Sequence, residues 1–291
     1  MHGKVVLITG AARGIGAATA LLLAALGAQL SLVGLEGDEL RAVAASCGPD
    51  ALAIEGDITD LPAMERAMAQ TAERFGRIDV VYQNAGIGSG GTLSLIQPEA
   101  IDRTLEVNVL GAFRVARAAI PHLERSGGYL LVNASIAALA NGFPGFGAYS
   151  MSKAATEALA NTLRVELKHH GIDVGCAYFS WIDTDMVRGA QEHKAFRTLR
   201  GTLVGPMAKT SPVSVAVDAA IRGMERRSRI VVAPWWVRGM LPLRALLQPL
   251  SEPTIRPAIP AIEREYAEEM EALGPDEVLK PVGPGGEAAA R

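Results

Sequence analysis

Short apolar runs alternate with longer amphipathic stretches along the first 233 residues. The apolar runs predict strands at Lys4–Thr9, Gln29–Val33, Ala51–Ile54, Ile78–Tyr82, Tyr129–Asn133, Asp173–Tyr178 and Arg229–Val232. The stretches between them predict a first helix that ends near Leu26, and further helices at Glu39–Ser46, Leu61–Phe75, Pro98–Glu124, Tyr149–His169 and Pro212–Arg226. Because strands alternate with helices, we expect parallel pairing through right-handed crossovers. The predicted fold class is therefore α/β: a doubly wound parallel seven-stranded sheet with helices on both faces.

The chain changes character after Ala233, where Pro, Leu and Arg become frequent. We expect residues 1–233 to form one domain and residues 234–273 to form a C-terminal arm that packs on this domain or on a partner subunit. Residues 274–291 are rich in Gly, Pro and Ala, which predicts a disordered tail.

The prolines of the arm determine which helices we expect in it. Pro242 and Pro249 are expected to interrupt any long helix, while an acidic helix is expected at Ile262–Leu273. Trp235 and Trp236 lie among arginines, a mixture that would also suit contact with a membrane surface. Of the two alternatives, we favour packing of the arm on its own domain or on a partner subunit.

Composition narrows the class of partner. A net charge of −3 excludes a globally basic nucleic-acid binder. The two cysteines, Cys47 and Cys176, make no disulfide framework, and no secretory signal pattern precedes the first strand, so a cytoplasmic setting is expected. The five histidines show no metal-ligand spacing, so no metal site is expected.

A glycine-rich turn joins the first strand to the first helix. It reads Thr9-Gly-Ala-Ala-Arg-Gly-Ile-Gly16, so Gly10, Gly14 and Gly16 surround Arg13 and Ile15. Glycines let a backbone approach a pyrophosphate closely, and a helix N-terminus offers free N–H groups and the positive end of its dipole. The alternative is a tight turn with no ligand.

Other motifs follow in a fixed order. Asp57 and Ile58 follow the third strand, Asn84-Ala85-Gly86 follows the fourth, Asn108 lies in the next helical region, Ser135 ends the fifth strand, and Tyr149-Ser-Met-Ser-Lys153 begins the next helix. With the glycine spacing G-x-x-x-G-x-G, this series resembles the compact single-domain branch of the short-chain dehydrogenase/reductase (SDR) family. The resemblance covers Lys4 to Ala233. It implies a Rossmann-like domain that binds NAD or NADP and contains a substrate loop at residues 185–211.

Tyr149 and Lys153 suit proton transfer to or from an alcohol oxygen. A free phenol has a pKa near 10, and a positive charge one helical turn away favours the phenolate. The resemblance implies that Ser135 holds the substrate oxygen and that Asn108 holds a water that relays protons. It also implies that Asp57 bonds the adenine and that Lys153 reaches the nicotinamide ribose. Taken singly, each residue could equally be a packing, capping or turn residue.

Two positions depart from the family pattern. Phe179-Ser180 stands where the family usually has Pro-Gly, although Ile182 and Thr184 match its nicotinamide-contacting segment. Gly34 stands where NAD-selective members carry Asp, which leaves room for a 2′-phosphate that Arg13 could bind. Glu36 nearby would repel that phosphate or bind a ribose hydroxyl. On balance the sequence favours NADP over NAD.

Apolar residues surround the predicted chemistry: Ile136, Leu139, Phe143, Phe146 and Trp181. They favour an apolar alcohol or ketone, lipid-like or steroid-like, as the substrate. The resemblance further implies a homodimer or homotetramer that pairs the helices at 98–124 and 149–169. Two other functions stay open: a catalytically silent cofactor-binding regulator, and an epimerase or dehydratase acting on sugar nucleotides.

Overall fold

One parallel sheet forms the centre of the computed structural model, which describes residues 1–139, 144–274, 278 and 280–290. Within these residues the sheet has seven strands in the order β3-β2-β1-β4-β5-β6-β7. The strands are β1 (Val5–Thr9), β2 (Gln29–Gly34), β3 (Leu52–Glu55), β4 (Val80–Gln83), β5 (Tyr129–Asn133), β6 (Asp173–Phe179) and β7 (Ile230–Ala233). All six pairings are parallel, which confirms the predicted fold class.

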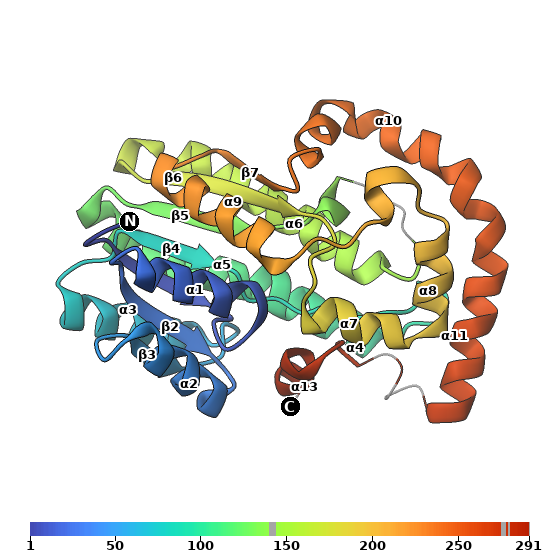
Figure 1. Cartoon of the computed structure of the whole chain (residues 1–291), viewed down its shortest axis with the longest axis horizontal. Helices are drawn as coiled ribbons and strands as arrows, with labels where there is room; N and C mark the ends of the chain where they lie inside the picture. The colour runs from blue at the N-terminus through green and yellow to red at the C-terminus, as the bar shows by residue number, and fades with distance from the viewer. Residues whose placement is uncertain (140–143, 275–277, 279, 291) are drawn as a thin grey trace.

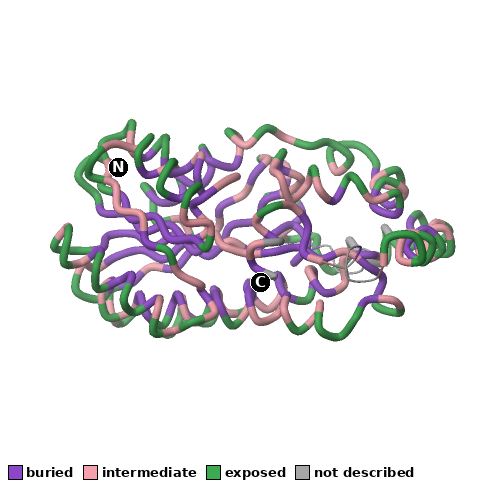
Figure 2. Tube along the Cα trace, turned by 90° about the horizontal axis from the view of Figure 1, so that it is seen from below, coloured by how far each residue is buried: buried purple, intermediate pink, exposed green. Residues whose placement is uncertain are grey.

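Helices cover both faces of this sheet (Figure 1). On one face lie α1 (Gly14–Ala25), α2 (Gly37–Cys47) and α9 (Val213–Arg226). On the other lie α3 (Leu61–Phe75), α5 (Ala112–Ser126) and α6 (Gly147–Glu166). The alternation of β1 explains the two layers, because Val6 and Ile8 pack under the first set while Leu7 packs under the second. Figure 2 shows the buried strands between exposed outer helix faces.

The helix predicted at Pro98–Glu124 contains a π-helical turn. It divides into α4 (Pro98–Leu105), the π turn Glu106–Gly111 and α5. Asn108 lies in this turn, and π turns inside α-helices frequently occur at functional sites. The hydrophobic periodicity alone gave no sign of the extra residue.

The region after β6 is helical rather than an open loop. It holds α7 (Asp185–Glu192), α8 (Lys194–Gly201) and a short 3-10 turn at Gly205–Ala208. The acidic helix α11 (Ile259–Leu273) packs on α8, so part of the arm does lie on the domain near the site.

Helix α10 (Val237–Ile255) contradicts the expectation for the arm, because it runs through Pro242, Pro249 and Pro253. All three prolines are exposed and lie on one side of the helix, where their rings bend it around the domain instead of ending it (Figure 1). The burial of Val237 and Met240 in the main core anchors its first turn. No helix in the described part of the chain is long and apolar enough to span a membrane.

The last residues also differ from the expectation of disorder. Val278 and Val282 are buried, and α13 (Pro284–Ala290) follows them with Ala289 buried in the main core. Apolar side chains spaced along a Gly/Pro-rich segment find a groove of the domain to fill, which composition alone does not reveal.

Candidate active site

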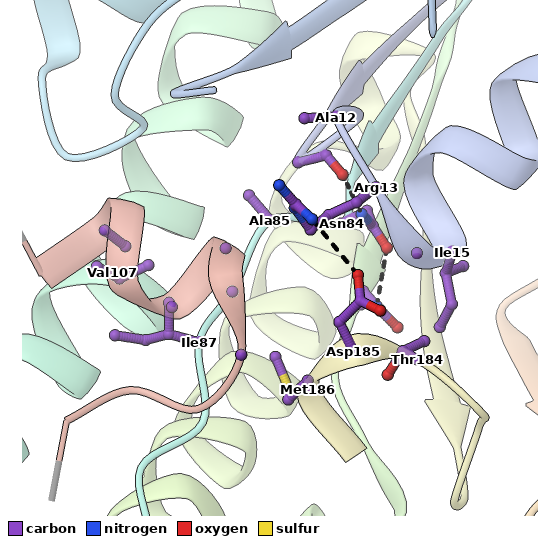
Figure 3. A pocket seen from close by; sticks show the side chains of 18 of the residues that line it. Ala12, Arg13, Ile15, Asn84, Ala85, Ile87, Val107, Thr184, Asp185 and Met186 are labelled. Atoms are coloured by element: carbon purple, nitrogen blue, oxygen red, sulfur yellow. Dashed lines mark hydrogen bonds and ion pairs between the residues drawn. The ribbon is translucent and has the colours of Figure 1, made fainter. Parts of the chain in front are cut away.

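A cavity of about 240 Å³ opens at the carboxyl edge of the sheet, where β1 and β4 lie side by side but lead to opposite halves. This is the topological switch point at which doubly wound sheets bind ligands. Figure 3 shows side chains from the glycine-rich turn, from the end of β4 and from α7 converging on it. All the predicted site residues except Gly16 and Asn108 line this cavity.

The glycine-rich turn has the geometry of a phosphate cradle. Gly10 has a φ of +65°, and a Cβ there would lie 2.8 Å from the Cα of Ala85. A Cβ on Gly16 would collide with the carbonyl oxygen of Gly10. Helix α1 begins at Gly14 with no side-chain cap on its first N–H groups. These donors remain open to an anion, so the turn fits the pyrophosphate of a dinucleotide.

Asn84 braces the two strands that flank the cavity. Its Nδ2 donates to the carbonyl oxygens of Thr9 and Gly10, both at 3.1 Å, and its Oδ1 accepts from Asn133 at 3.3 Å. Ala85 and Gly86 then pass along the cavity wall. The motif that starts at Asn84 therefore holds the ends of β1, β4 and β5 in register, and its backbone lines the site.

Three carboxylates surround Arg13. Its guanidinium forms a close bidentate pair with Glu36 and lies 3.6 Å from both Glu39 and Asp185. The hydrogen bonds that Arg13 donates to Glu36 raise the pKa of Arg13. Gly34 lines the same wall of the cavity, where a Cβ would lie in ordinary contact with Leu40 and Ala12. The residue predicted to bind a 2′-phosphate is thus already neutralised by its own neighbours.

Asp57 and Ile58 form the far end of the cavity. Asp57 accepts the N–H of Thr59 at 2.8 Å and pairs with Arg103 at 3.7 Å. Ile58 is buried beside Val107. A carboxylate above an apolar floor suits a flat heteroaromatic ring that carries an amino group.

Ser135, Tyr149 and Lys153 meet at the other end. Burial raises the pKa of the Tyr149 phenol, and the hydroxyl of Ser135, which lines the same two cavities, opposes this shift. Lys153 is buried, donates to the carbonyl oxygen of Asn133 at 2.9 Å, and holds its Nζ 5.6 Å from the centroid of the Tyr149 ring. Burial lowers the pKa of Lys153 to about 8.

Asn108 lies behind this group and does not line the cavity. Its Oδ1 accepts the N–H of Ile87, and its Nδ2 donates to the Ile87 carbonyl and to Ser152. Its backbone carbonyl accepts from Thr156 at 3.1 Å. These bonds fix the π turn against helix α6, so the side chain has a positioning role here whether or not its carbonyl also holds a water.

The segment after β6 closes the cavity. Ser180 takes the place of the family's glycine, and its N–H donates to Ala233 at 2.8 Å. The hydroxyl of Ser180 and Oδ1 of Asn133 are buried without a described partner, so both are available to a ligand. Ile182 is buried, and Thr184 precedes α7 with its hydroxyl 3.4 Å from the Ile182 carbonyl.

A second, smaller cavity of about 80 Å³ adjoins Ser135 and Tyr149. Its lining is almost wholly apolar: Ile136, Ala137, Phe146, Trp181, Met186, Val187, Ala190, Phe196, Met207 and Val282. The sequence predicted Ile136, Phe146 and Trp181; Phe143 lies outside the described residues, and Leu139 is buried in the core instead. Phe196 was missed, although the amphipathic pattern of α8 pointed an aromatic residue inward.

Arg200 packs on Trp181, one of the residues that line this second cavity. Its guanidinium lies 4.4 Å above the ring of Trp181 and bonds Ala208 and Thr210. Because it is engaged by these groups and does not line the cavity, it offers no free positive charge to a substrate. The arrangement suits an uncharged, compact substrate held against the Tyr149 phenol.

Comparison with known proteins gives one consistent family. Residues 4–195 match the short chain dehydrogenase family. Versicolorin reductase 1 of Aspergillus parasiticus is 38% identical over 191 residues, 64% of this chain and 72% of that protein. Trans-4-hydroxycyclohexanecarboxylate dehydrogenase of Sinomonas cyclohexanicum is 34% identical over 195 residues, 64% of this chain and 75% of that protein.

Solved structures agree. A levodione reductase aligns with a TM-score of 0.73 and 27% identity, over 80% of this chain and 96% of that one. The 3-ketoacyl-(acyl-carrier-protein) reductase of Brucella melitensis, complexed with NADH, aligns with a TM-score of 0.71 and 26% identity, over 80% of this chain and 97% of that one.

Proposed function

Because the chain belongs to the short chain dehydrogenase family, we propose that it interconverts an uncharged ring alcohol and its ketone with a nicotinamide dinucleotide. Membership makes the chain an oxidoreductase, and NAD(P) dependence goes with it. The finer assignment rests on one observation: the Ser135–Tyr149 pair opens directly into an apolar cavity.

Different parts of the cavity would bind different parts of the cofactor. The turn from Gly10 to Gly16 would hold the pyrophosphate, Asp57 and Ile58 the adenine, and Lys153 with Ser180 the nicotinamide half. The chemistry that a bound nicotinamide dinucleotide would supply is hydride transfer, from the alcohol carbon in oxidation and to the ketone carbon in reduction.

Tyr149 is the proposed general acid and base. In oxidation its phenolate accepts the proton of the alcohol oxygen, while Ser135 donates a hydrogen bond that holds this oxygen in place. The ammonium of Lys153 stabilises the phenolate, which the apolar surroundings would otherwise disfavour. In reduction the same phenol returns its proton to the ketone oxygen.

We propose NAD rather than NADP as the cofactor, in contrast to the preference drawn from the sequence. The bidentate pair with Glu36 occupies the Arg13 guanidinium that a 2′-phosphate would need. A phosphate would also meet the charge of Glu36, Glu39 and Asp185. A ribose hydroxyl, in contrast, can donate to Glu36.

The apolar cavity supports the substrate class. Its aromatic residues pack edge to face, as Phe146 does on Trp181 at 5.9 Å between ring centroids, and leave a compact, rigid space. The Sinomonas relative acts, by its name, on a hydroxyl group of a six-membered ring that also carries a carboxylate. None of the described residues that line the apolar cavity here is cationic, so the ring is the part of that substrate that this site suits. A cyclohexanol-like or fused-ring alcohol therefore suits this site better than the lipid-like chain that the sequence also allowed.

A panel of ring alcohols and ketones, with NAD and NADP in turn, tests this function through the absorbance of reduced nicotinamide. Turnover of uncharged ring substrates with NAD is expected, with slower turnover of matched ring carboxylates. Activity confined to charged substrates would refute the substrate class.

Assembly is a separate expectation. Leu110, Phe113 and Met151 expose apolar surface on the π turn, α5 and α6, the helices expected to pair between subunits. We propose a homodimer or homotetramer that covers them. Light scattering at micromolar concentration checks this, and a monomer would contradict it.

A further inference from the structure

The C-terminal segment formed by residues 278 and 280–290 lies along the cavity that the dinucleotide is proposed to enter. Gly283, Gly285, Gly286 and Ala289 line that cavity directly. In Figure 3 the α13 ribbon, in pale red, borders the pocket on the side opposite Arg13 and Ile15. Chain from the far end of the sequence therefore forms one wall of the site.

Specific contacts hold this segment in place. The N–H of Val282 donates to the carbonyl oxygen of Gly88 at 2.8 Å, and Nε of Arg103 donates to the carbonyl oxygen of Ala289 at 2.7 Å. Val282 and Ala289 are buried. The segment is thus attached at both ends of the cavity.

Two facing glycines allow the middle of the segment to approach α7 closely. A Cβ on Gly189 would lie 3.0 Å from the amide nitrogen of Gly283. Gly283 has a φ of +79°, and a Cβ there would lie 3.0 Å from the carbonyl oxygen of Asp185. Side chains at either position would push the segment away, so the sequence of both elements suits this contact.

The segment covers the adenosine end in particular. Ala289 packs in the same apolar cluster as Ile58 and Val107, and Arg103 links it to Asp57. A Cβ on Gly285 would lie 3.5 Å from Cδ of Arg13 and 3.6 Å from a carboxylate oxygen of Glu36, the pair that borders the ribose position. These are the surfaces that the proposed function gives to the adenine and its ribose.

The space that remains is small for a dinucleotide. The cavity measures about 240 Å³, below the roughly 300–1,000 Å³ typical of sites for small ligands. A dinucleotide is a large member of that class. The C-terminal segment is one of the walls that limit this space, so its departure would enlarge the adenosine end of the cavity.

We propose that the C-terminal segment is a built-in competitor of the adenosine half of the dinucleotide, an inference that rests on the proposed function. The segment docks on Ile58, Val107 and Arg103 in the free protein and leaves when the cofactor binds. The apparent affinity for the cofactor is then reduced by the fraction of molecules in which the segment is docked.

Removal of residues 282–291 tests this through the dissociation constant for NADH, measured by nicotinamide fluorescence. We expect the shortened chain to bind NADH about tenfold more tightly, an equilibrium change of ~1.4 kcal/mol. Ala289→Gln in the full chain should act in the same direction, because it places an unpaired amide in the apolar cluster. Ala272→Gln, on the exposed end of α11, is the matched control and should bind like the wild type.

Hydrogen exchange at the amide of Val282 tests the same proposal independently of the affinity for NADH. Its N–H should be protected in the free protein and should exchange faster when NADH is added, because it loses Gly88 as a partner. Unchanged or weaker binding by both altered forms would overturn the competition. So would stronger protection of Val282 with NADH, which would make the segment a clamp. If no form bound any dinucleotide, the proposed function itself would fail.

Discussion

The sheet region, residues 5–233, and the C-terminal region, residues 237–290, are stabilised in different ways. In the sheet region every strand is paired, and alternate side chains of the strands are buried under helices on both faces. In the C-terminal region, α10 touches the core mainly through its first turn, and Leu243, Leu246 and Leu250 remain exposed, as does Trp235 just before the helix. The first region holds the proposed catalytic residues, whereas the second contributes part of the lining of the cavities next to them.

The largest expected effect concerns the sheet region. Tyr149→Phe keeps the ring but removes the proton that the reaction exchanges, so turnover should fall by about 10²–10⁴-fold. Binding of NADH should stay within about twofold of wild type, because the hydroxyl is one of many contacts along the cavity. Steady-state rates and fluorescence titration check the two halves, and near-normal turnover would remove Tyr149 from its role.

A matched pair of substitutions in α10 sharpens the comparison inside the arm. Met240→Ala deletes a side chain that is 8% exposed and packed in the main core, so it should lower the free energy of unfolding by about 2–5 kcal/mol. Leu246→Ala changes a side chain that is 54% exposed, so the free energy should change by less than about 0.5 kcal/mol.

Urea denaturation measures both α10 variants. Equal decreases in the free energy of unfolding for the two variants would mean that a partner covers the outer face of α10 in solution. The C-terminal region would then be packed as fully as the sheet region.

The buried Lys153 links function to stability through pH. Because burial lowers its pKa to about 8, the unfolded chain, whose lysines titrate near pH 10.4, binds more protons between these values. The cost of burying the charge is therefore fully present below about pH 8 and disappears as pH rises toward 10.4. Lys153→Met should remove this cost, which amounts to about 3 kcal/mol less the lost bond to Asn133.

The measured quantity is the difference in unfolding free energy between Lys153→Met and wild type. It should favour the variant at pH 7 and shrink as pH rises, while other titrating groups cancel. A difference that does not depend on pH would mean that Lys153 is neutral, or well solvated, in the folded protein.

The smallest expected effect concerns cofactor choice at Glu36. Glu36→Gln removes the charged bidentate partner of Arg13 and leaves only the longer pairs with Glu39 and Asp185 at 3.6 Å, so the guanidinium can turn to a 2′-phosphate. The affinity for NADP should rise about tenfold relative to NAD. Gly34→Asp should move the ratio toward NAD, and space for its Cβ exists next to Leu40 at 3.4 Å. An unchanged ratio in both variants would place the adenosine ribose elsewhere.

The sequence predicted the sheet region better than it predicted the C-terminal region. The buried strands were visible as apolar runs, and the set of Ser135, Tyr149 and Lys153 was visible from motif order, because parallel strands bring their carboxyl ends to one edge. The pairing of Arg13 with Glu36 could not be predicted from the sequence. It depends on the side-chain rotamers of two residues that are 23 positions apart.

The C-terminal region was the least predictable. Proline content suggested an interrupted helix, yet exposed prolines on one side bend α10 without ending it. Composition suggested disorder after residue 274, yet Val282 and Ala289 find partners in a groove made by distant parts of the chain. Such contacts have no local signature in the sequence.

The central claim is that this site moves a hydride from an alcohol carbon while Tyr149 takes the proton. The most direct test uses a ring alcohol deuterated at its carbinol carbon, with NAD and either the wild type or Tyr149→Phe, and mass spectrometry of the nicotinamide product. The account predicts one deuterium in the reduced nicotinamide with the wild type, and far slower transfer with the variant at equal cofactor occupancy. Reduced nicotinamide without deuterium, or equal transfer rates in the two proteins, would contradict it.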